Sequence, residues 1–354
     1  MKALRLREHV PLAPLTTLGI GGEAELFAQW QNPQELINLL EHAQNLQKPH
    51  WLLGGGSNVI IADRGLPGLV LQPAGEQIEI LQQNPDLWTL DVDAGVQWDV
   101  LVQWTLAQEL GGLECLSGIP GLVGSAPIQN IGAYGQEVAQ SIQAVEVLNL
   151  QTGKLEVLDR DACQFGYRQS VWKQQPGRAI VTRVRMQLAR RPQPCTRYAQ
   201  VAEALHTEPH PTLQRVREVV LALRRQKGMV VDALDPESCS VGSFFVNPIV
   251  TPQQAETARK LERGRAMPLW PAEAGKVKLS AAWLIEHAGL QRGDGPEQRP
   301  QAPVGLSRKH TLAIVNRGGA TALDVLEFAN EIVRKVQDTA GIHLEREPVV
   351  LGEV

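Results

Sequence analysis

The sequence lacks the features of secreted, membrane-spanning and disulfide-stabilised proteins. Its four cysteines stand far apart among 354 residues, with no C-x-x-C pair, which argues against both a zinc site and a disulfide framework. The first residues contain no apolar signal region, and no window approaches the ~20 uninterrupted apolar residues of a membrane span. We therefore expect a cytoplasmic protein with no membrane insertion and no metal site.

The sequence also lacks a strong charge of either sign. Lys and Arg number 34 against 38 Asp and Glu, and the basic residues are scattered, so we expect no nucleic-acid surface. A small anionic ligand held by a few basic residues remains compatible with this balance. The hydrophobic fraction of 43% is typical of a globular chain, and the length predicts two or three domains.

Helical and strand-like patterns are mixed along the chain. Asn32 and Pro33 are typical of a helix start, and Leu36 and Leu39 follow them at helical spacing. The same reasoning predicts strands at 51–53, 59–61, 68–71, 142–150 and 179–188, and helices at 98–108, 212–226, 281–287 and 322–337. This mixture predicts an α+β fold. The stretch 190–194, rich in arginine and proline, predicts a domain boundary.

Two glycine-rich loops have the composition of a dinucleotide site. The first is GGGSN at 54–58, directly after a predicted strand, and the second is the run 117–135 with five glycines. Glycine lets backbone N–H groups approach a pyrophosphate closely, and Ile119 and Ile131 suit a flat, partly apolar ring such as an isoalloxazine. Tight turns without a ligand would explain either loop alone, but the two together favour a flavin dinucleotide.

A third glycine segment, GIGGEA at 19–24, formally fits the G-x-G-x-x-A pattern. That fingerprint requires a strand before it and a helix after it. The preceding PLTTL is a poor strand. We therefore reject a Rossmann site here.

Seven segments, in order along essentially the whole chain, resemble the UDP-N-acetylenolpyruvoylglucosamine reductase family. They lie at 17–22, 53–58, 119–121, 130–135, 165–170, 242–248 and 344–347. The resemblance implies an FAD-binding module of the vanillyl-alcohol-oxidase (PCMH) type in two subdomains, followed by an α+β substrate-binding domain. It implies FAD as cofactor and NADPH as co-substrate, the preference for NADPH over NADH resting on the resemblance alone.

The resemblance also implies a domain plan and an activity. The FAD-binding module would span 1–190, with subdomains of about 1–70 and 71–190, and the substrate-binding domain 191–354. Residues 340–354 would return a catalytic glutamate to the flavin site. The activity would be reduction of UDP-N-acetylglucosamine enolpyruvate to UDP-N-acetylmuramate in peptidoglycan precursor synthesis, by a protein that we expect to be a monomer.

Three residues match the catalytic positions of that family. A guanidinium suits the substrate carboxylate, where negative charge builds during hydride addition, and Arg168 fits this role. Ser243 fits the proton donor to the resulting carbanion or enolate. The family usually has LEPEV near the C-terminus, but this chain has LEREPV, and counting back from 351–352 assigns Glu347, with Glu345 as the alternative.

The remaining site residues follow from the resemblance position by position. For each of these residues the alternative is a purely structural role, in an ion pair, in a turn or at the surface. In one subgroup the position of Trp270 is a loop tyrosine that covers the substrate phosphate; indole donates a hydrogen bond but accepts none. We expect cofactor contacts from Gly54, Gly55, Gly56, Ser57, Asn58, Ile119, Pro120, Gly124, Ser125, Asn130 and Gly132, and substrate contacts from Tyr198, Lys227, Asn247, Trp270, Lys278 and His310.

Three other functions compete with this one. A flavin oxidase of the same superfamily often tethers its flavin through histidine, and neither glycine loop contains one. A non-catalytic UDP-sugar or flavin-binding protein would not need Ser243 and Arg168. A metal site at His206 and His210 is disfavoured because Pro209 prevents a helical presentation of both rings.

Overall fold

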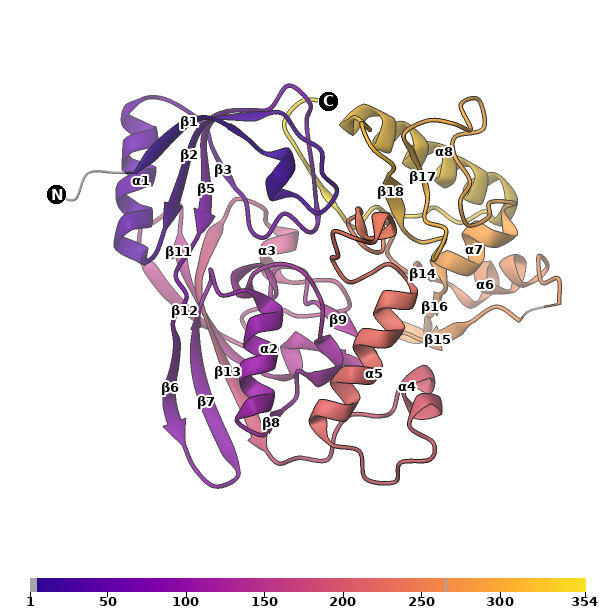
Figure 1. Ribbon diagram of the computed structural model, residues 1–354, viewed down its shortest axis with the longest axis horizontal. Coiled ribbons are helices and arrows are strands. Elements are labelled where there is room, and N and C mark those ends of the chain that lie inside the picture. Colours follow the sequence, from indigo (N-terminus) through magenta and orange to yellow (C-terminus); the bar gives the residue numbers. More distant parts are fainter. Residues whose placement is uncertain (1–4, 265) are drawn as a thin grey trace. The chain divides into compact units, whose positions relative to one another are not determined.

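The computed structural model describes residues 5–264 and 266–354, and the chain forms two compact units. Unit 1 consists of Met1–Val10, Ala24–Gly56 and Pro67–Gln226, and unit 2 of Pro11–Glu23, Ser57–Leu66 and Lys227–Val354. Each unit thus contains segments from both the N-terminal part and later parts of the chain (Figure 1).

The first sheet of unit 1 is covered by an amphipathic helix. Its strand order is β1 (Leu6–Pro11), β2 (Glu23–Trp30), β5 (Leu66–Pro73) and β3 (His50–Leu52). Helix α1 (Pro33–Asn45) begins as predicted, because the side chain of Asn32 accepts a hydrogen bond from the backbone of Glu35 at 3.0 Å. Its apolar stripe packs on Trp30, Leu69 and Leu71 of the sheet.

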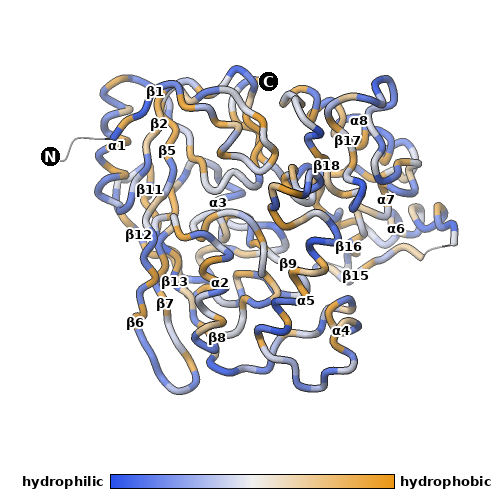
Figure 2. Tube along the Cα trace, viewed as in Figure 1, coloured by the Kyte–Doolittle hydropathy of each residue, from blue (hydrophilic) through white to orange (hydrophobic). Residues whose placement is uncertain are grey.

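The second sheet of unit 1 has six strands and carries the larger core. The order is β12 (Leu155–Asp159), β11 (Ile142–Asn149), β13 (Ala179–Arg190), β7 (Leu87–Asp93) and β6 (Ile78–Gln83), all antiparallel, with β8 (Leu110–Gly111) beside β13. Apolar residues recur along β7 and β13 (Figure 2) and pack against α2 (Trp98–Ala107). The short elements β9 (Gly132–Ala133), β10 (Gln136–Glu137) and α3 (Val171–Gln174) complete this part.

Helices α4 (Ala199–Ala204) and α5 (Leu213–Gln226) belong to unit 1, so the compact units do not divide at the predicted boundary of 190. The reason is apolar packing: Val216, Val219 and Val220 of α5 lie in one buried cluster with Val201 and Cys115. The polar segment 190–194 is therefore a connection within unit 1 and not the boundary between the two units.

Unit 2 surrounds a core in which N-terminal and C-terminal residues mix. Leu18, Ile20 and Ile60 pack in the same cluster as Phe244 and Phe245. Its sheets are β14 (Ile249–Val250), β16 (Val277–Leu279) and β15 (Leu269–Pro271); β17 (Val304–Leu306) and β18 (Ile314–Asn316); and β19 (Val349–Leu351) parallel to β4 (Val59–Ile61). Its helices are α6 (Pro252–Arg259), α7 (Ala281–His287) and α8 (Ala322–Ala340).

The structure confirms the predicted helices and strands and the α+β class. The rejected Rossmann segment is also explained: residues 19–22 follow the 3-10 helix η1 (Ala13–Leu15) and lead into strand β2, not into a helix. Within the described residues, no helix is long and apolar enough to cross a membrane.

Helix α8 provides a test of the unit 2 core. Phe328 is 1% exposed, whereas Leu323 on the same helix is 51% exposed. We expect Phe328→Ala to lower the free energy of unfolding by about 3–5 kcal/mol, because it leaves a cavity. We expect Leu323→Ala to change it by less than about 0.5 kcal/mol. Urea unfolding of the full chain measures both, and equal losses would contradict this packing.

Candidate active site

The two glycine-rich loops meet in unit 1. A Cβ atom on Gly55 would lie 2.5 Å from the Cα of Gly121, and one on Gly54 would collide with the Oγ of Ser125. Gly56 and Gly121 also adopt φ of +65° and +120°, which favour glycine. Only glycine at these positions permits the two loops to pack backbone against backbone. Two glycine loops in contact are what a dinucleotide cradle requires, so the residues fit the predicted flavin site.

The run 117–135 is held on the second sheet by backbone hydrogen bonds. Gly124 N–H donates to Ala94 O at 2.9 Å, and Trp98 N–H donates to Gly121 O at 3.0 Å. A Cβ on Gly124 would lie 2.5 Å from the Cβ of Ala94. The loop is therefore a packed part of unit 1, and not a flexible linker.

The side chain of Asn130 is occupied by protein groups. Its Nδ2 donates to the Glu137 carboxylate at 2.8 Å and to Gly166 O at 2.9 Å, and its Oδ1 accepts from Ala139 N–H at 3.1 Å. Asn130 is buried, with a φ of +45°. The amide side chain of Asn130 therefore holds the loop together, and its backbone N–H donates to Pro127 O at 3.2 Å.

Arg168 lies against the end of the same run. Its Nη2 donates to Gly132 O at 2.8 Å, and its guanidinium carbon is 5.5 Å from the centre of the Tyr167 ring. The residue is half-buried with a φ of +55°, a conformation that non-glycine residues rarely adopt. Such strain is typical of functional sites, where the surrounding structure imposes it.

In unit 2 the C-terminal segment runs beside Ser243. Glu347 N–H donates to Phe244 O at 2.9 Å, and Val246 N–H donates to Glu345 O at 3.0 Å, which makes a short antiparallel pairing. Asn58 Nδ2 donates to Glu347 O at 3.2 Å. The structure therefore brings three predicted site residues, Asn58, Ser243 and Glu347, into one neighbourhood.

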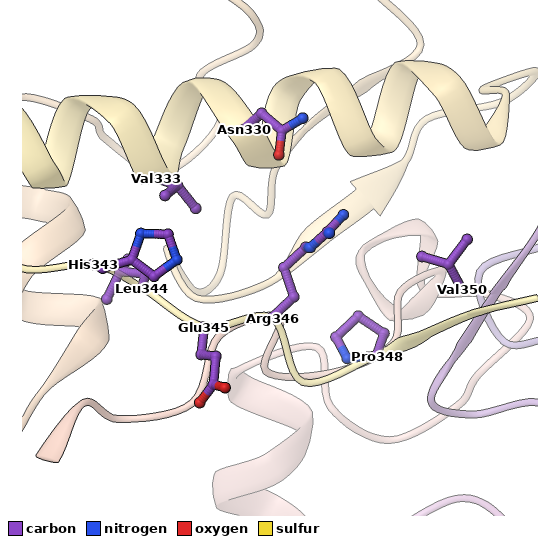
Figure 3. A pocket seen from close by; sticks show the side chains of 8 residues that line it. All are labelled: Asn330, Val333, His343, Leu344, Glu345, Arg346, Pro348 and Val350. Atoms are coloured by element: carbon purple, nitrogen blue, oxygen red, sulfur yellow. The ribbon is translucent and has the colours of Figure 1, made fainter. Parts of the chain in front are cut away.

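The two glutamates of the C-terminal segment differ in their surroundings. Glu345 is exposed, whereas Glu347 is half-buried. Glu345 and Arg346 line a cavity of about 390 Å³ together with Asn330 of α8. Figure 3 shows Arg346 pointing toward α8 and the Glu345 carboxylate pointing away from it. Neither Ser243 nor Glu347 lines this cavity, although Glu345 and Arg346 pair with the chain just after Ser243.

Two tyrosines stack in unit 1. The rings of Tyr198, a predicted substrate contact, and Tyr134 lie edge to face with centroids 5.2 Å apart. Burial raises the pKa of Tyr134 to about 12 and also raises the pKa of Tyr198. Both phenols therefore remain protonated at neutral pH. The pairing was missed from sequence because the two residues lie in different segments, although Tyr134 stands in the glycine-rich run.

Lys227 and His310 interact electrostatically in unit 2, as do Arg292 and His310. Burial, and then the positive charges of Lys227 and Arg292, lower the pKa of His310 to about 4. His310 is thus neutral at physiological pH, and its ring nitrogens provide one donor and one acceptor. The sequence did not suggest Arg292, because its proximity to His310 depends on the tertiary fold.

Three further predicted contacts lie on or beside the hairpin of β15 and β16. Trp270 pairs with Lys278 in the strand register, and the Lys278 ammonium is 5.6 Å from the centre of the indole. Trp270 is 39% exposed. Asn247 has a structural contact, since its Oδ1 accepts from the N–H of Ala281 at the start of α7 at 2.9 Å.

Comparison with known proteins assigns the chain to a family. The relative from Thermobifida fusca named UDP-N-acetylenolpyruvoylglucosamine reductase is 42% identical, over 97% of both chains, and that from Streptomyces coelicolor is 41% identical, over 97% of this chain and 89% of the relative. The chain belongs to the UDP-N-acetylenolpyruvoylglucosamine reductase family. The family's C-terminal domain model matches residues 235–351, which include Ser243 and Glu347.

The FAD-binding domain model matches residues 24–159, which contain both glycine loops. A crystal structure of the reductase from Thermus caldophilus is 30% identical with a TM-score of 0.68, and the match covers 99% of this chain and all of that one. The chain is therefore an FAD-dependent oxidoreductase, and the predicted family, fold class and cofactor are confirmed.

Neutral His310 predicts a pH dependence. Its folded pKa of about 4 lies below the ordinary value of 6.5, so the unfolded chain binds a proton in that window when the folded chain does not. The contribution of His310 to stability is fully present above pH 6.5 and is lost as the pH falls toward 4. NMR titration of His310 should show this low pKa, and Lys227→Met should raise it; an unchanged pKa in that variant would contradict the charge interaction.

Proposed function

We propose that this chain uses NADPH to reduce the enolpyruvyl ether of UDP-N-acetylglucosamine enolpyruvate to a lactyl ether, giving UDP-N-acetylmuramate for peptidoglycan synthesis. Family membership supports the reaction. The observation that carries the residue assignment is the backbone pairing of the C-terminal segment with 244–246, in which Glu347 N–H donates to Phe244 O.

FAD, when bound, supplies the hydride that adds to the methylene carbon of the enolpyruvyl group. We assign its binding to the two glycine loops, through Gly54, Gly55, Gly56, Ser57 and Asn58 and through Ile119, Pro120, Gly124, Ser125, Asn130 and Gly132. The contact between the loops supports this assignment, because backbone N–H groups can then converge on a pyrophosphate.

Ser243 is the proposed proton donor. The carbon that bears the carboxylate gains a proton as the methylene becomes a methyl group, so the substrate gains one hydride and one proton. Gly242, at a φ of +76°, precedes Ser243, and buried Phe244 and Phe245 follow it. A neutral hydroxyl suffices as the acid against a strongly basic carbon.

Arg168 and Glu347 are proposed to act on the substrate carboxylate, toward which charge builds. A guanidinium donates two parallel hydrogen bonds to a carboxylate. In Arg168 one nitrogen already bonds Gly132 O, which fixes the orientation of the group. Glu347 would share a proton with the carboxylate or with Ser243. Its half-buried position supports its assignment over the exposed Glu345.

The substrate contacts are proposed from Tyr198, Lys227, Asn247, Trp270, Lys278 and His310. Lys227 and Lys278 provide cations for the pyrophosphate, and protonated Tyr198 provides a donor. Trp270 stands beside Lys278 and is proposed to cover the same group. We further propose a cytoplasmic monomer; its four free cysteines fit a reducing compartment.

Ser243→Ala provides the decisive test. In an anaerobic visible spectrum we expect the variant to bind FAD and to bleach with NADPH, but not to regain colour with UDP-N-acetylglucosamine enolpyruvate. Wild type and Ser280→Ala, which removes only the N-cap of α7, should both regain colour. Normal recovery of colour in Ser243→Ala would overturn the proton-donor assignment. Recovery of wild type only in air would identify an oxidase.

The same substitution at Glu347 and at Glu345 tests which of the two glutamates is catalytic. We expect Glu347→Gln to lower kcat for the UDP-sugar about 100-fold or more, in the range typical of losing general acid–base assistance, without loss of FAD. Glu345→Gln should behave as wild type because its carboxylate is exposed. Steady-state kinetics with NADPH decides between them, and the opposite pattern would move the catalytic role to Glu345.

A further inference from the structure

Two carboxylates outside the proposed catalytic set contact the two ends of the run 117–135. Asp99, near the start of α2, accepts Gly118 N–H at 2.6 Å. Glu114, in the 3-10 helix η2 (Glu114–Leu116), accepts Gln136 Nε2 at 2.9 Å. The first contact lies at the beginning of the run, and the second lies one residue beyond its end.

Asp99 connects the run to helix α5. Arg217 of α5, only 7% exposed, donates to both oxygens of Asp99 at 2.7 Å. Gln103 adds a bond at 3.1 Å. Burial alone would raise the pKa of Asp99, but the hydrogen bonds from Arg217 and Gly118 outweigh it and hold the pKa below its usual range. The carboxylate is thus charged, and every partner described here is a donor.

The Glu114 carboxylate accepts hydrogen bonds from three segments of the chain. It is 2% exposed, and its oxygens accept Gly112 N–H at 2.7 Å, Cys195 N–H at 2.9 Å and Gln136 Nε2 at 2.9 Å. The other end of the Gln136 amide accepts Cys115 N–H at 2.8 Å. An amide at position 114 could not satisfy these three donors, because its own NH₂ group would face one of them.

We call Asp99 and Glu114 the two anchors of the run 117–135. The backbone between them has residues in left-handed conformations. Gly118 adopts a φ of +71°, and two residues with side chains, Asn130 and Tyr134, have φ of +45° and +48°. Such conformations persist only where the surrounding structure imposes them. Fixed ends, together with the backbone bonds of Gly121 and Gly124 in the middle, provide that constraint.

We propose that Asp99 and Glu114 are positioning residues that hold the two ends of the run 117–135 in its flavin-binding conformation. This inference rests on the proposed use of that run as a flavin loop. Neither carboxylate needs to touch the cofactor. Both act through the backbone that they hold, and Arg217 makes α5 part of the same scaffold.

The test uses the full-length protein with Asp99→Asn and Glu114→Gln. Loss of a charged hydrogen-bonding partner predicts that the Kd for FAD rises about 10- to 100-fold in each variant. The visible absorption maxima and the reduction potential of the bound flavin should also shift, because the loop groups around the ring move. In steady-state turnover, kcat should fall while the KM for the UDP-sugar changes less than about twofold.

Asp91→Asn is the matched control. Asp91 is a buried carboxylate of β7, 7% exposed and paired with Arg183 at 3.0 Å, but it makes no described contact with the run 117–135. This variant should lose thermal stability and keep the wild-type Kd, spectrum and potential. If Asp99→Asn and Glu114→Gln behave in the same way, the two carboxylates only stabilise the fold and the proposal is wrong.

Gln136→Ala keeps the test decisive if a charge-removing variant fails to fold. It releases the end of the run from Glu114 without removing the carboxylate, and it should shift the flavin spectrum and the Kd in the same direction. An unchanged Kd and spectrum would overturn the Glu114 anchor. Arg217→Lys tests the Asp99 anchor in the same way. Lysine keeps the positive charge but loses the paired hydrogen bonds to the two oxygens of Asp99. Failure of wild type to be reoxidised by the UDP-sugar would instead refute the proposed function, and the FAD affinities would still decide the anchoring.

Discussion

Unit 2 depends on the backbone hydrogen bonds of the C-terminal segment. Val349 N–H donates to Asn58 O at 3.1 Å, Ala62 N–H donates to Leu351 O at 2.9 Å, and Glu347 N–H donates to Phe244 O. One extended segment thus joins a strand near residue 60 to the chain around Ser243. A shift of this pairing by one residue would turn every side chain of the segment to the opposite face. The position of the proposed catalytic glutamate follows from this pairing.

Unit 1 depends on a different constraint, the close contact of two glycine loops. Backbones approach at Gly55 and Gly121 because neither residue has a Cβ atom. The two anchors, Asp99 and Glu114, then act where the glycine run itself provides little stiffness. Glycine allows the approach but gives no preference for one conformation. Hydrogen bonds to half-buried Asp99 and buried Glu114 near the two ends supply that preference.

Much of the local structure followed from the sequence. The Asn32 cap, the apolar spacing of α1 and α8, and the extended β-branched segments predicted elements that the structure contains. The family assignment also followed, because its motifs are short, local and in order. The domain boundary did not coincide with the compact units. The linker composition of 190–194 is a local signal, whereas the packing of α5 on Cys115 is set by residues about a hundred positions away.

The sequence by itself determined the family, the two glycine loops proposed to bind FAD and the residue types available for catalysis, because motif order and glycine content are properties of adjacent residues. Only the tertiary structure decided that Glu347 is half-buried beside Phe244 while Glu345 is exposed, and that Asp99 pairs with Arg217. It also showed that the Asn130 side chain makes its hydrogen bonds to protein groups. The first two outcomes depend on segments more than 100 residues apart, and the third on partners 7 to 36 residues away. None of these contacts leaves a periodicity or a local composition that reveals it in the sequence.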